Sequence, residues 1–204
     1  DSLWTDIKKA HSLGIKIIMM LGGAGGAYTT LFSNFDLYYN ITKSFIESNK
    51  DIIDGIDLDI EESIGLNPTI KLIKQLKIDF PLDFIISMAP IQSSLEYDIN
   101  GMGGFIYKDL YLECGDLIDY FNSQFYEDYS VDSFQKIIVN GYPPEKIIVG
   151  SISCQNINQN LDTIKLIKTK YPNFGGVFNW EYFDSPPDLN NPGKWSELMG
   201  DIIQ

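Results

Sequence analysis

Short apolar runs alternate with amphipathic helical patterns along almost the entire chain, and this alternation limits the folds that are open to it. The apolar runs are rich in isoleucine and valine and are mostly apolar on both faces. Parallel strands that are covered on both sides have this character. The repeated strand–loop–helix order therefore predicts an α/β fold with parallel strands. No linker-like Pro/Ser stretch divides the chain, so we expect one domain over residues 1–204.

The expected elements can be given by residue range. We expect strands at residues 15–21, 52–60, 84–89, 120–125, 147–152 and 175–179. We expect helices at residues 3–13, 35–48, 68–77, 109–118, 131–140, 161–170 and 195–203. A doubly wound sheet and a (β/α)8 barrel both fit this order, and periodicity does not separate them.

The second expected strand carries a row of acids, Asp57, Asp59 and Glu61. Side chains alternate between the two faces of a strand, so these three point to one side and the aliphatic residues between them to the other. A solvated edge strand would explain the row, but parallel strands inside an alternating chain are normally covered. Carboxyls that crowd one another tend to hold a proton, which suits a general acid near neutral pH. The row therefore favours a wet catalytic cavity, with Glu61 last on the strand.

The composition narrows the partners and cofactors. Lys and Arg number 15 against 28 Asp and Glu, and the net charge of -13 disfavours nucleic acids and anionic membranes. His11, Cys114 and Cys154 are too few for a metal site built from His and Cys, so no metal and no cofactor is expected. No apolar run is long enough to span a membrane. Gly22 and Gly23 lack the lysine of a phosphate-binding loop and are interpreted as turn residues that leave room for a ligand.

The octapeptide Asp54-Gly55-Ile56-Asp57-Leu58-Asp59-Ile60-Glu61 resembles the D-x-x-D-x-D-x-E signature of glycoside hydrolase family 18. That family includes plant-type and bacterial chitinases and endo-β-N-acetylglucosaminidases. Other segments resemble its strand ends in the family's order, and they are Met20-Leu21-Gly22-Gly23, Ser87-Met88-Ala89-Pro90, Gln124-Phe125-Tyr126 and Gly175-Gly176-Val177-Phe178-Asn179-Trp180. The resemblance covers almost the whole chain, is closest to the compact chitinases, and implies a (β/α)8 TIM barrel.

The same resemblance implies a retaining, substrate-assisted hydrolysis of β-1,4-linked N-acetylglucosamine in chitin or chitooligosaccharides, without a cofactor. In that scheme Glu61 is the general acid and base, Asp59 orients the substrate's acetamido group, and Asp57 shares a proton with Asp59. Tyr126 would donate its hydroxyl to the acetamido oxygen. Substrate contacts are implied for Trp180, which would stack under the sugar ring, and for Gln124, Met88, Gly22 and Gly23. Asp54 is interpreted as a structural residue of the motif.

Two features depart from the family's pattern. Met20 stands where the family usually has a serine whose hydroxyl supports the buried aspartates, so Asp57 lacks that donor. The first strand of this chain matches the family's third strand, so the chain would supply strands three to eight of a barrel. A six-stranded barrel would leave open edges, and we therefore expect a fragment of a longer protein or a further segment that completes the barrel.

Two other functions remain open. An endo-β-N-acetylglucosaminidase that acts on N-glycans uses the same motif. A lectin-like or structural member without catalysis is the other alternative, although such relatives usually lose the residue that matches Glu61 or Asp59. A secreted or extracellular location is favoured by the class of substrate alone.

Overall fold

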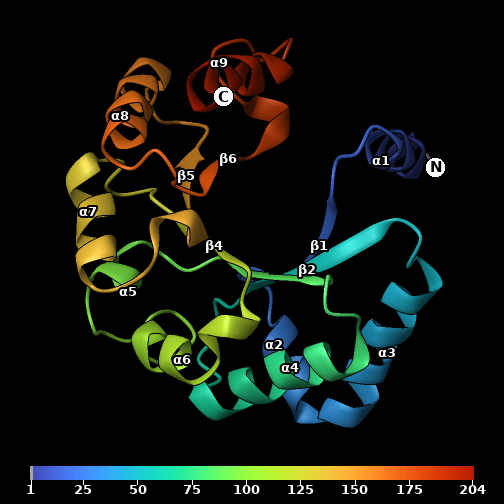
Figure 1. Cartoon of the computed structure of the whole chain (residues 1–204). Helices are drawn as coiled ribbons and strands as arrows, with labels where there is room; N and C mark the ends of the chain where they lie inside the picture. The colour runs from blue at the N-terminus through green and yellow to red at the C-terminus, as the bar shows by residue number, and fades with distance from the viewer. Residues whose placement is uncertain (1) are drawn as a thin grey trace. The chain divides into compact units, whose positions relative to one another are not determined.

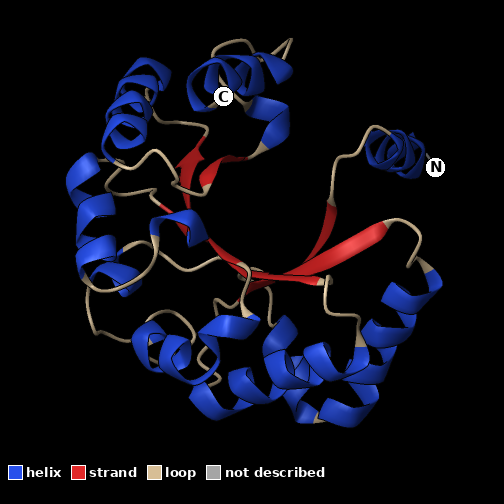
Figure 2. Cartoon of the chain, in the orientation of Figure 1, coloured by secondary structure: helices blue, strands red, loops and turns tan. Residues whose placement is uncertain are grey.

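The computed structural model of the protein describes residues 2–204, which fall into two compact units. Unit 1 comprises the described residues up to Met88 together with Met102–Phe105 and Asp109–Asp119. Unit 2 comprises Ala89–Gly101, Ile106–Lys108 and Tyr120–Gln204. Figure 1 follows the chain through both units by colour, and Figure 2 distinguishes strands from helices.

Unit 1 is built on strands that pair in parallel in chain order. They are β1 (Ile17–Gly22), β2 (Ile53–Asp59) and β3 (Ile85–Met88). The helices that precede or connect them are α1 (Ser2–Ser12), α2 (Ala27–Ser33), α3 (Phe35–Ser48) and α4 (Leu66–Asp79). In Figure 1, α2, α3 and α4 gather beside these strands. Sequential parallel pairing is what helical crossovers between neighbouring strands produce.

The core of unit 1 follows from the alternation along β2. Ile56, Leu58 and Ile60 lie on one side of the strand and are at most 2% exposed. Helix α4 buries Leu72 and Ile73, which are also at most 2% exposed, on its inner face. Burying each such side chain contributes roughly 1.5–3 kcal/mol relative to leaving it in water. This apolar layer holds the opposite, acidic side of β2 in a fixed orientation.

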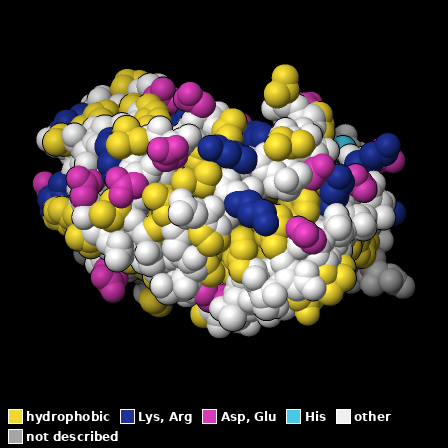
Figure 3. Space-filling model, turned by 90° about the horizontal axis from the view of Figure 1, so that it is seen from below, with side chains coloured by type: hydrophobic (Ala, Val, Ile, Leu, Met, Phe, Trp, Pro, Cys, Tyr) yellow, Lys and Arg dark blue, Asp and Glu magenta, His cyan; other side chains and the backbone are white. Residues whose placement is uncertain are grey.

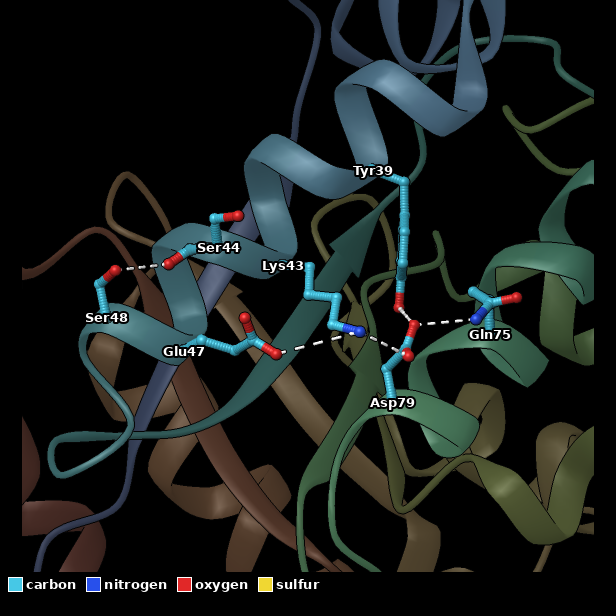
Figure 4. A network of polar contacts seen from close by, with 7 residues as sticks. All are labelled: Tyr39, Lys43, Ser44, Glu47, Ser48, Gln75 and Asp79. Carbon is cyan, nitrogen blue, oxygen red and sulfur yellow. Dashed lines mark hydrogen bonds and ion pairs between the residues drawn. The ribbon is translucent and has the colours of Figure 1, made fainter.

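A single carboxylate fastens α3 to α4. Asp79, the last residue of α4, accepts hydrogen bonds from the Tyr39 hydroxyl at 2.8 Å and the Lys43 ammonium at 2.7 Å on α3, and from the Gln75 amide at 2.8 Å (Figure 4). The Lys43 ammonium first, and then the Gln75 amide, hold the pKa of Asp79 below its ordinary value. The helices before and after β2 are therefore tied to each other.

Unit 2 repeats the same construction. Its strands pair in parallel in chain order and are β4 (Tyr120–Gln124), β5 (Ile147–Ile152) and β6 (Gly176–Trp180). Its helices are α5 (Ser93–Glu96), α7 (Val131–Val139), α8 (Ile157–Lys170) and α9 (Gly193–Ile203). The short 3-10 turns of the chain are η1 (Gly115–Leu117), η2 (Pro144–Lys146) and η3 (Tyr182–Asp184). The residues of α6 (Tyr107–Cys114) divide between the two units.

Aromatic side chains fill the core of unit 2 beside β4. Phe121 of β4 has no exposed surface and meets the ring of Tyr142 edge-on, with the ring centroids 5.7 Å apart. Phe134 of α7 and Val149 of β5 are also fully buried. Edge-on aromatic pairs contribute about 0.5–1.5 kcal/mol beyond their buried area. This packing holds the strand ends that carry the predicted site residues of unit 2.

The predicted α/β class with parallel strands is confirmed. Each expected strand is present, with its ends within two residues of the predicted range. Helices α2 and α5 were not expected, because seven and four residues are too short to show a helical period. No helix within residues 2–204 has both the length and the apolar character that a membrane crossing requires. On the face drawn in Figure 3, acidic and basic side chains are interspersed.

Candidate active site

The acidic row lies on β2, where the neighbouring strands of unit 1 fix its position. Asp57 is paired in register with Met20 of β1 and Ser87 of β3. Asp57 and Asp59 are each 8% exposed, whereas Glu61 lies two residues beyond the end of β2 and is half-buried. The row therefore does not form the solvated face of an edge strand. Its two inner acids are buried, and its last acid is accessible.

Asp57 receives a hydroxyl donor from β3 rather than from β1. Ser87 Oγ donates to Asp57 Oδ1 at 2.5 Å, and Ser87 has no exposed surface. Met20 is 46% exposed and carries a thioether, which has no proton to donate. The polar support that the sequence lacks at Met20 is thus supplied from the opposite neighbouring strand. A hydroxyl that donates to a carboxylate favours its charged form.

The crowding of the acids has its effect on Asp59. Burial, and after it the negative charges of Glu61 and Asp57, raise the pKa of Asp59 from 3.8 to about 7. Asp59 therefore keeps a proton up to nearly neutral pH. A carboxyl in that state can donate one hydrogen bond and accept others, whereas a carboxylate can only accept.

Gly22 and Gly23 close the end of β1 against the end of β2. The Gly23 amide donates to the Asp59 carbonyl at 2.9 Å. A Cβ on Gly22, whose φ is +118°, would lie 2.0 Å from the Asp59 carbonyl oxygen and 2.5 Å from the Tyr28 ring. At Gly22 the missing side chain therefore makes room for the protein itself, and the expectation that it leaves room for a ligand is wrong. A Cβ on Gly23 would lie 3.7 Å from Asp59 Oδ2, so Gly23 borders that carboxyl directly.

The residues at the other ends of the motifs have different surroundings. Met88, the last residue of β3, has no exposed surface, so it packs in the core and its implied substrate contact is wrong. Asp54, near the start of β2, accepts hydrogen bonds from the Ile17 amide and the Lys16 ammonium, both at 2.8 Å. Partial burial acts to raise the pKa of Asp54, but these donors outweigh it and lower the pKa below its ordinary value. The geometry at Asp54 fits a structural role at the base of the strand.

In unit 2, Gln124 is the last residue of β4 and Tyr126 lies two residues further on. Gln124 is 6% exposed, and its side-chain amide donates to the Ala89 carbonyl at 2.9 Å. Tyr126 is half-buried, and Gln155 holds its backbone by donating to the carbonyls of Phe125 at 2.9 Å and Tyr126 at 3.0 Å. The main chain that carries the Tyr126 phenol is therefore fastened to the segment after β5.

Trp180 ends β6 with 46% of its surface exposed. Ser153 donates to the Trp180 carbonyl from its amide at 2.8 Å and from its hydroxyl at 3.0 Å. The Ser153 hydroxyl also accepts from the Glu181 amide at 2.9 Å, across a cis Trp180–Glu181 peptide bond. An indole that is exposed on a fixed main chain is suited to stacking on the apolar face of a sugar ring.

The predicted site residues thus form two sets. Asp57, Asp59 and Glu61 interact with one another at the end of β2 in unit 1. Gln124, Tyr126 and Trp180 lie at or just beyond strand ends in unit 2. That both sets line one pocket stays a prediction. Among the residues that the structure describes, no group of three His, Cys, Asp or Glu side chains could hold a metal ion.

Several supporting polar residues were not expected from the sequence. They are Glu62, Ser87, Ser153 and Gln155. Ser87 could have been found, because its alignment with Asp57 follows once the Met-Ala-Pro segment is placed on the next parallel strand. Ser153 and Gln155 follow β5 and show no pattern of their own. Glu62 is hidden in the sequence by its neighbour Glu61, which takes the last place in the signature.

No family model matches the chain. Chitinase 2 of Rhizopus oligosporus is 28% identical to it over 222 residues, which cover 95% of this chain but only 38% of that protein. A fungal endo-β-N-acetylglucosaminidase from glycosyl hydrolase family 18 is 29% identical with a TM-score of 0.91, and the match covers 99% of this chain and 77% of that one. A chitinase from Aspergillus fumigatus is 30% identical with a TM-score of 0.86, over 100% of this chain and 78% of that one.

A family 18 chitinase from Pseudoalteromonas aurantia has the same fold at 26% identity, with a TM-score of 0.75 and coverage of 96% of this chain. These matches confirm the expected fold class, the α/β architecture of the TIM-barrel glycosidases, with fewer strand–helix units in this chain. The chain belongs to glycoside hydrolase family 18. It spans 38% of the length of the curated relative that it matches.

Proposed function

We propose that this chain hydrolyses β-1,4 bonds between N-acetylglucosamine units in chitin or chitooligosaccharides. The observation that carries this proposal is the position of Asp57, Asp59 and Glu61 at the carboxyl end of β2, in a chain of a glycosidase family. Active sites of barrel enzymes lie at the carboxyl ends of their strands. Chitinases are among the solved and curated relatives, which supports this class of substrate.

The proposed mechanism is substrate-assisted and retains the configuration of the anomeric carbon. Glu61 donates its proton to the glycosidic oxygen while the substrate's own acetamido oxygen attacks the anomeric carbon. The bond to the leaving sugar breaks as the bond to the acetamido oxygen forms, which produces an oxazolinium ion. Glu61, now a carboxylate, takes a proton from water, and the hydroxide opens the oxazolinium ion at the anomeric carbon.

The buried acids give Asp59 its proposed role. A proton on Asp59, favoured by its raised pKa, can be shared with Asp57, whose other support is the Ser87 hydroxyl. The remaining oxygen of Asp59 then accepts the acetamido N–H and holds the attacking oxygen in place. As the oxazolinium charge develops, Asp59 stabilises it electrostatically. In the same proposal Tyr126 donates to the acetamido oxygen, Gln124 helps to hold the reacting sugar, and Trp180 lies beneath it.

An endo-β-N-acetylglucosaminidase activity is the second candidate, and one observation favours it. A fungal enzyme with this activity has a TM-score of 0.91 with this chain, against 0.86 for the Aspergillus fumigatus chitinase. Both reactions cleave beside an N-acetylglucosamine and can use the same acids. They differ in the sugars that surround the cleaved bond.

The purified chain should be incubated separately with chitohexaose and with a high-mannose glycoprotein, and the products followed by mass spectrometry. Release of short N-acetylglucosamine oligomers supports the chitinase proposal, and release of high-mannose glycan supports the alternative. The first product should be the β-anomer by proton NMR, because the mechanism retains configuration. Sugar binding by the wild-type chain without cleavage of either substrate would leave the non-catalytic alternative.

A further inference from the structure

Glu62, the residue after the proposed acid, binds the start of a helix that lies far from it in the sequence. Its carboxylate accepts from the Tyr28 amide at 3.0 Å and from the Thr29 amide at 2.7 Å. Partial burial acts to raise the pKa of Glu62, but the Thr29 hydroxyl and the amides at this helix start outweigh it and hold the pKa below its ordinary value. Glu62 is therefore charged at neutral pH and bound to main-chain donors.

Helix α2 has no cap of its own. Its N-cap position is Gly26, which has φ +78° and no side chain that could accept from the first amides of the helix. Glu62 supplies that acceptor from the segment after β2, with a negative charge that the positive end of the helix favours. The bond therefore joins the glycine turn of β1 and the helix behind it to the chain that carries Glu61.

A second contact holds the chain on the other side of Glu61. The Asp59 carbonyl accepts from the Gly23 amide at 2.9 Å, and the Tyr28 hydroxyl donates to the Leu21 carbonyl at 2.7 Å. Tyr28 has no exposed surface, so this end of β1 is packed as well as hydrogen-bonded. Glu61 is thus held between an anchored Asp59 and an anchored Glu62, with only Ile60 besides.

We propose that Glu62 is a positioning residue for Glu61, which it holds in place through the N-terminus of α2. This inference rests on the proposed function of Glu61. A plain helix cap would affect stability alone. A positioning residue also controls the distance between the Glu61 carboxyl and the glycosidic oxygen, and misplacement of about 1 Å can cost 10²-fold in rate.

The test compares Glu62→Ala, Glu62→Gln and the control Glu47→Ala. Glu62→Ala removes both hydrogen bonds, and Glu62→Gln keeps a neutral oxygen acceptor of the same reach. Glu47 is a half-exposed carboxylate on α3, 3.9 Å from the Lys43 ammonium, and its removal changes the net charge equally. We expect kcat to fall roughly 10- to 100-fold in Glu62→Ala with KM within about threefold of wild type. Glu62→Gln should stay within about fivefold of the wild-type kcat, and Glu47→Ala should match wild type.

Amide hydrogen exchange gives a readout that does not depend on activity. The amides of Tyr28 and Thr29 should exchange faster in Glu62→Ala and near the wild-type rate in Glu62→Gln, because only the former loses the acceptor. A wild-type kcat in Glu62→Ala would overturn the proposal, and so would a Glu62→Gln variant as slow as Glu62→Ala. If the wild-type chain cleaves no glycan, the proposed function fails, while unchanged exchange at Tyr28 and Thr29 would independently refute the anchor.

Discussion

Ser87 on β3 and Asp57 on β2 share a hydrogen bond of 2.5 Å that replaces a donor missing from β1. The replacement is possible because Asp57 is paired in register with Met20 on one side and with Ser87 on the other. Side chains at paired positions of neighbouring parallel strands point to the same face. Either neighbouring strand can therefore carry the hydroxyl that a buried aspartate needs.

Ser87→Ala should lower kcat/KM roughly 10- to 100-fold, because a hydrogen bond to a charged group contributes about 1.5–3 kcal/mol. Adding Met20→Ser to Ser87→Ala should restore part of the loss, since position 20 is also paired with Asp57. Steady-state kinetics of both variants check this. Ser48→Ala is the control, because Ser48 is exposed and bonds only within α3. A double variant no better than Ser87→Ala would contradict the exchange of donors.

Glu61→Gln should reduce kcat by about 10²–10⁴-fold, because an amide neither donates a proton to the leaving oxygen nor takes one from water. Binding of a chitooligosaccharide, measured by calorimetry, should stay close to wild type, because glutamine keeps the shape of the side chain. Glu47→Gln, on an exposed face of α3, serves as the matched control. Wild-type turnover in Glu61→Gln would remove Glu61 from the reaction.

Asp59→Asn should change how stability depends on pH. The folded pKa of Asp59 is about 7 against an ordinary 3.8, so the folded state holds the proton more tightly. Wild-type stability therefore falls as pH rises from about 4 to about 7, because the folded state binds more protons than the unfolded state in that window. The variant lacks this loss and should gain about 1–3 kcal/mol relative to wild type between pH 4 and pH 8. Urea unfolding at both pH values checks the difference, and a constant offset would show that Asp59 is not the titrating group.

Trp180→Ala should weaken chitooligosaccharide binding by about 10-fold or more, because each stacked aromatic face contributes on the order of 1 kcal/mol or more. The free energy of unfolding should change little, since Trp180 is 46% exposed. Trp4→Ala removes a tryptophan from α1, away from the strand ends, and should leave the dissociation constant unchanged. If binding is indifferent to Trp180 but stability drops, the indole belongs to the core.

Asp79→Ala should lower the free energy of unfolding by about 1–3 kcal/mol, because it leaves the Tyr39 hydroxyl and the Lys43 ammonium without their shared acceptor. The pKa of Asp79 is lowered in the folded state, so its contribution is present above about pH 4 and is lost as the pH falls further. Urea unfolding at pH 7 and pH 3 measures both effects. Asp162→Ala, at a side chain 75% exposed on α8, should stay within about 0.5 kcal/mol of wild type. Equal losses at the two pH values would argue against the ionised network.

Local pattern was enough to predict most of the fold. The strands were found because each is a short apolar run bounded by turn residues, and such runs keep their identity without tertiary context. The unexpected α2 shows where this method fails. Its start is capped by Glu62, which lies 34 residues from Tyr28 in the chain, so the local sequence of α2 holds no cap to detect.

The acidic row illustrates the same division for the site. Period-two alternation was enough to put Asp57, Asp59 and Glu61 on one face of a strand. It did not separate their environments, because burial and neighbouring charge depend on which strands and helices surround β2. The structure buries Asp57 and Asp59 and leaves Glu61 half-exposed beyond the strand.

The sequence by itself determined the order of the elements, the face that the acids share and the resemblance to family 18, because each depends on residues that are neighbours in the chain. Only the tertiary structure decided that Ser87 serves Asp57, that Gly22 makes room for Asp59 and Tyr28, and that Glu62 caps α2. These are contacts between segments far apart in the chain. Their partners are selected by strand register and helix packing, which no local pattern encodes.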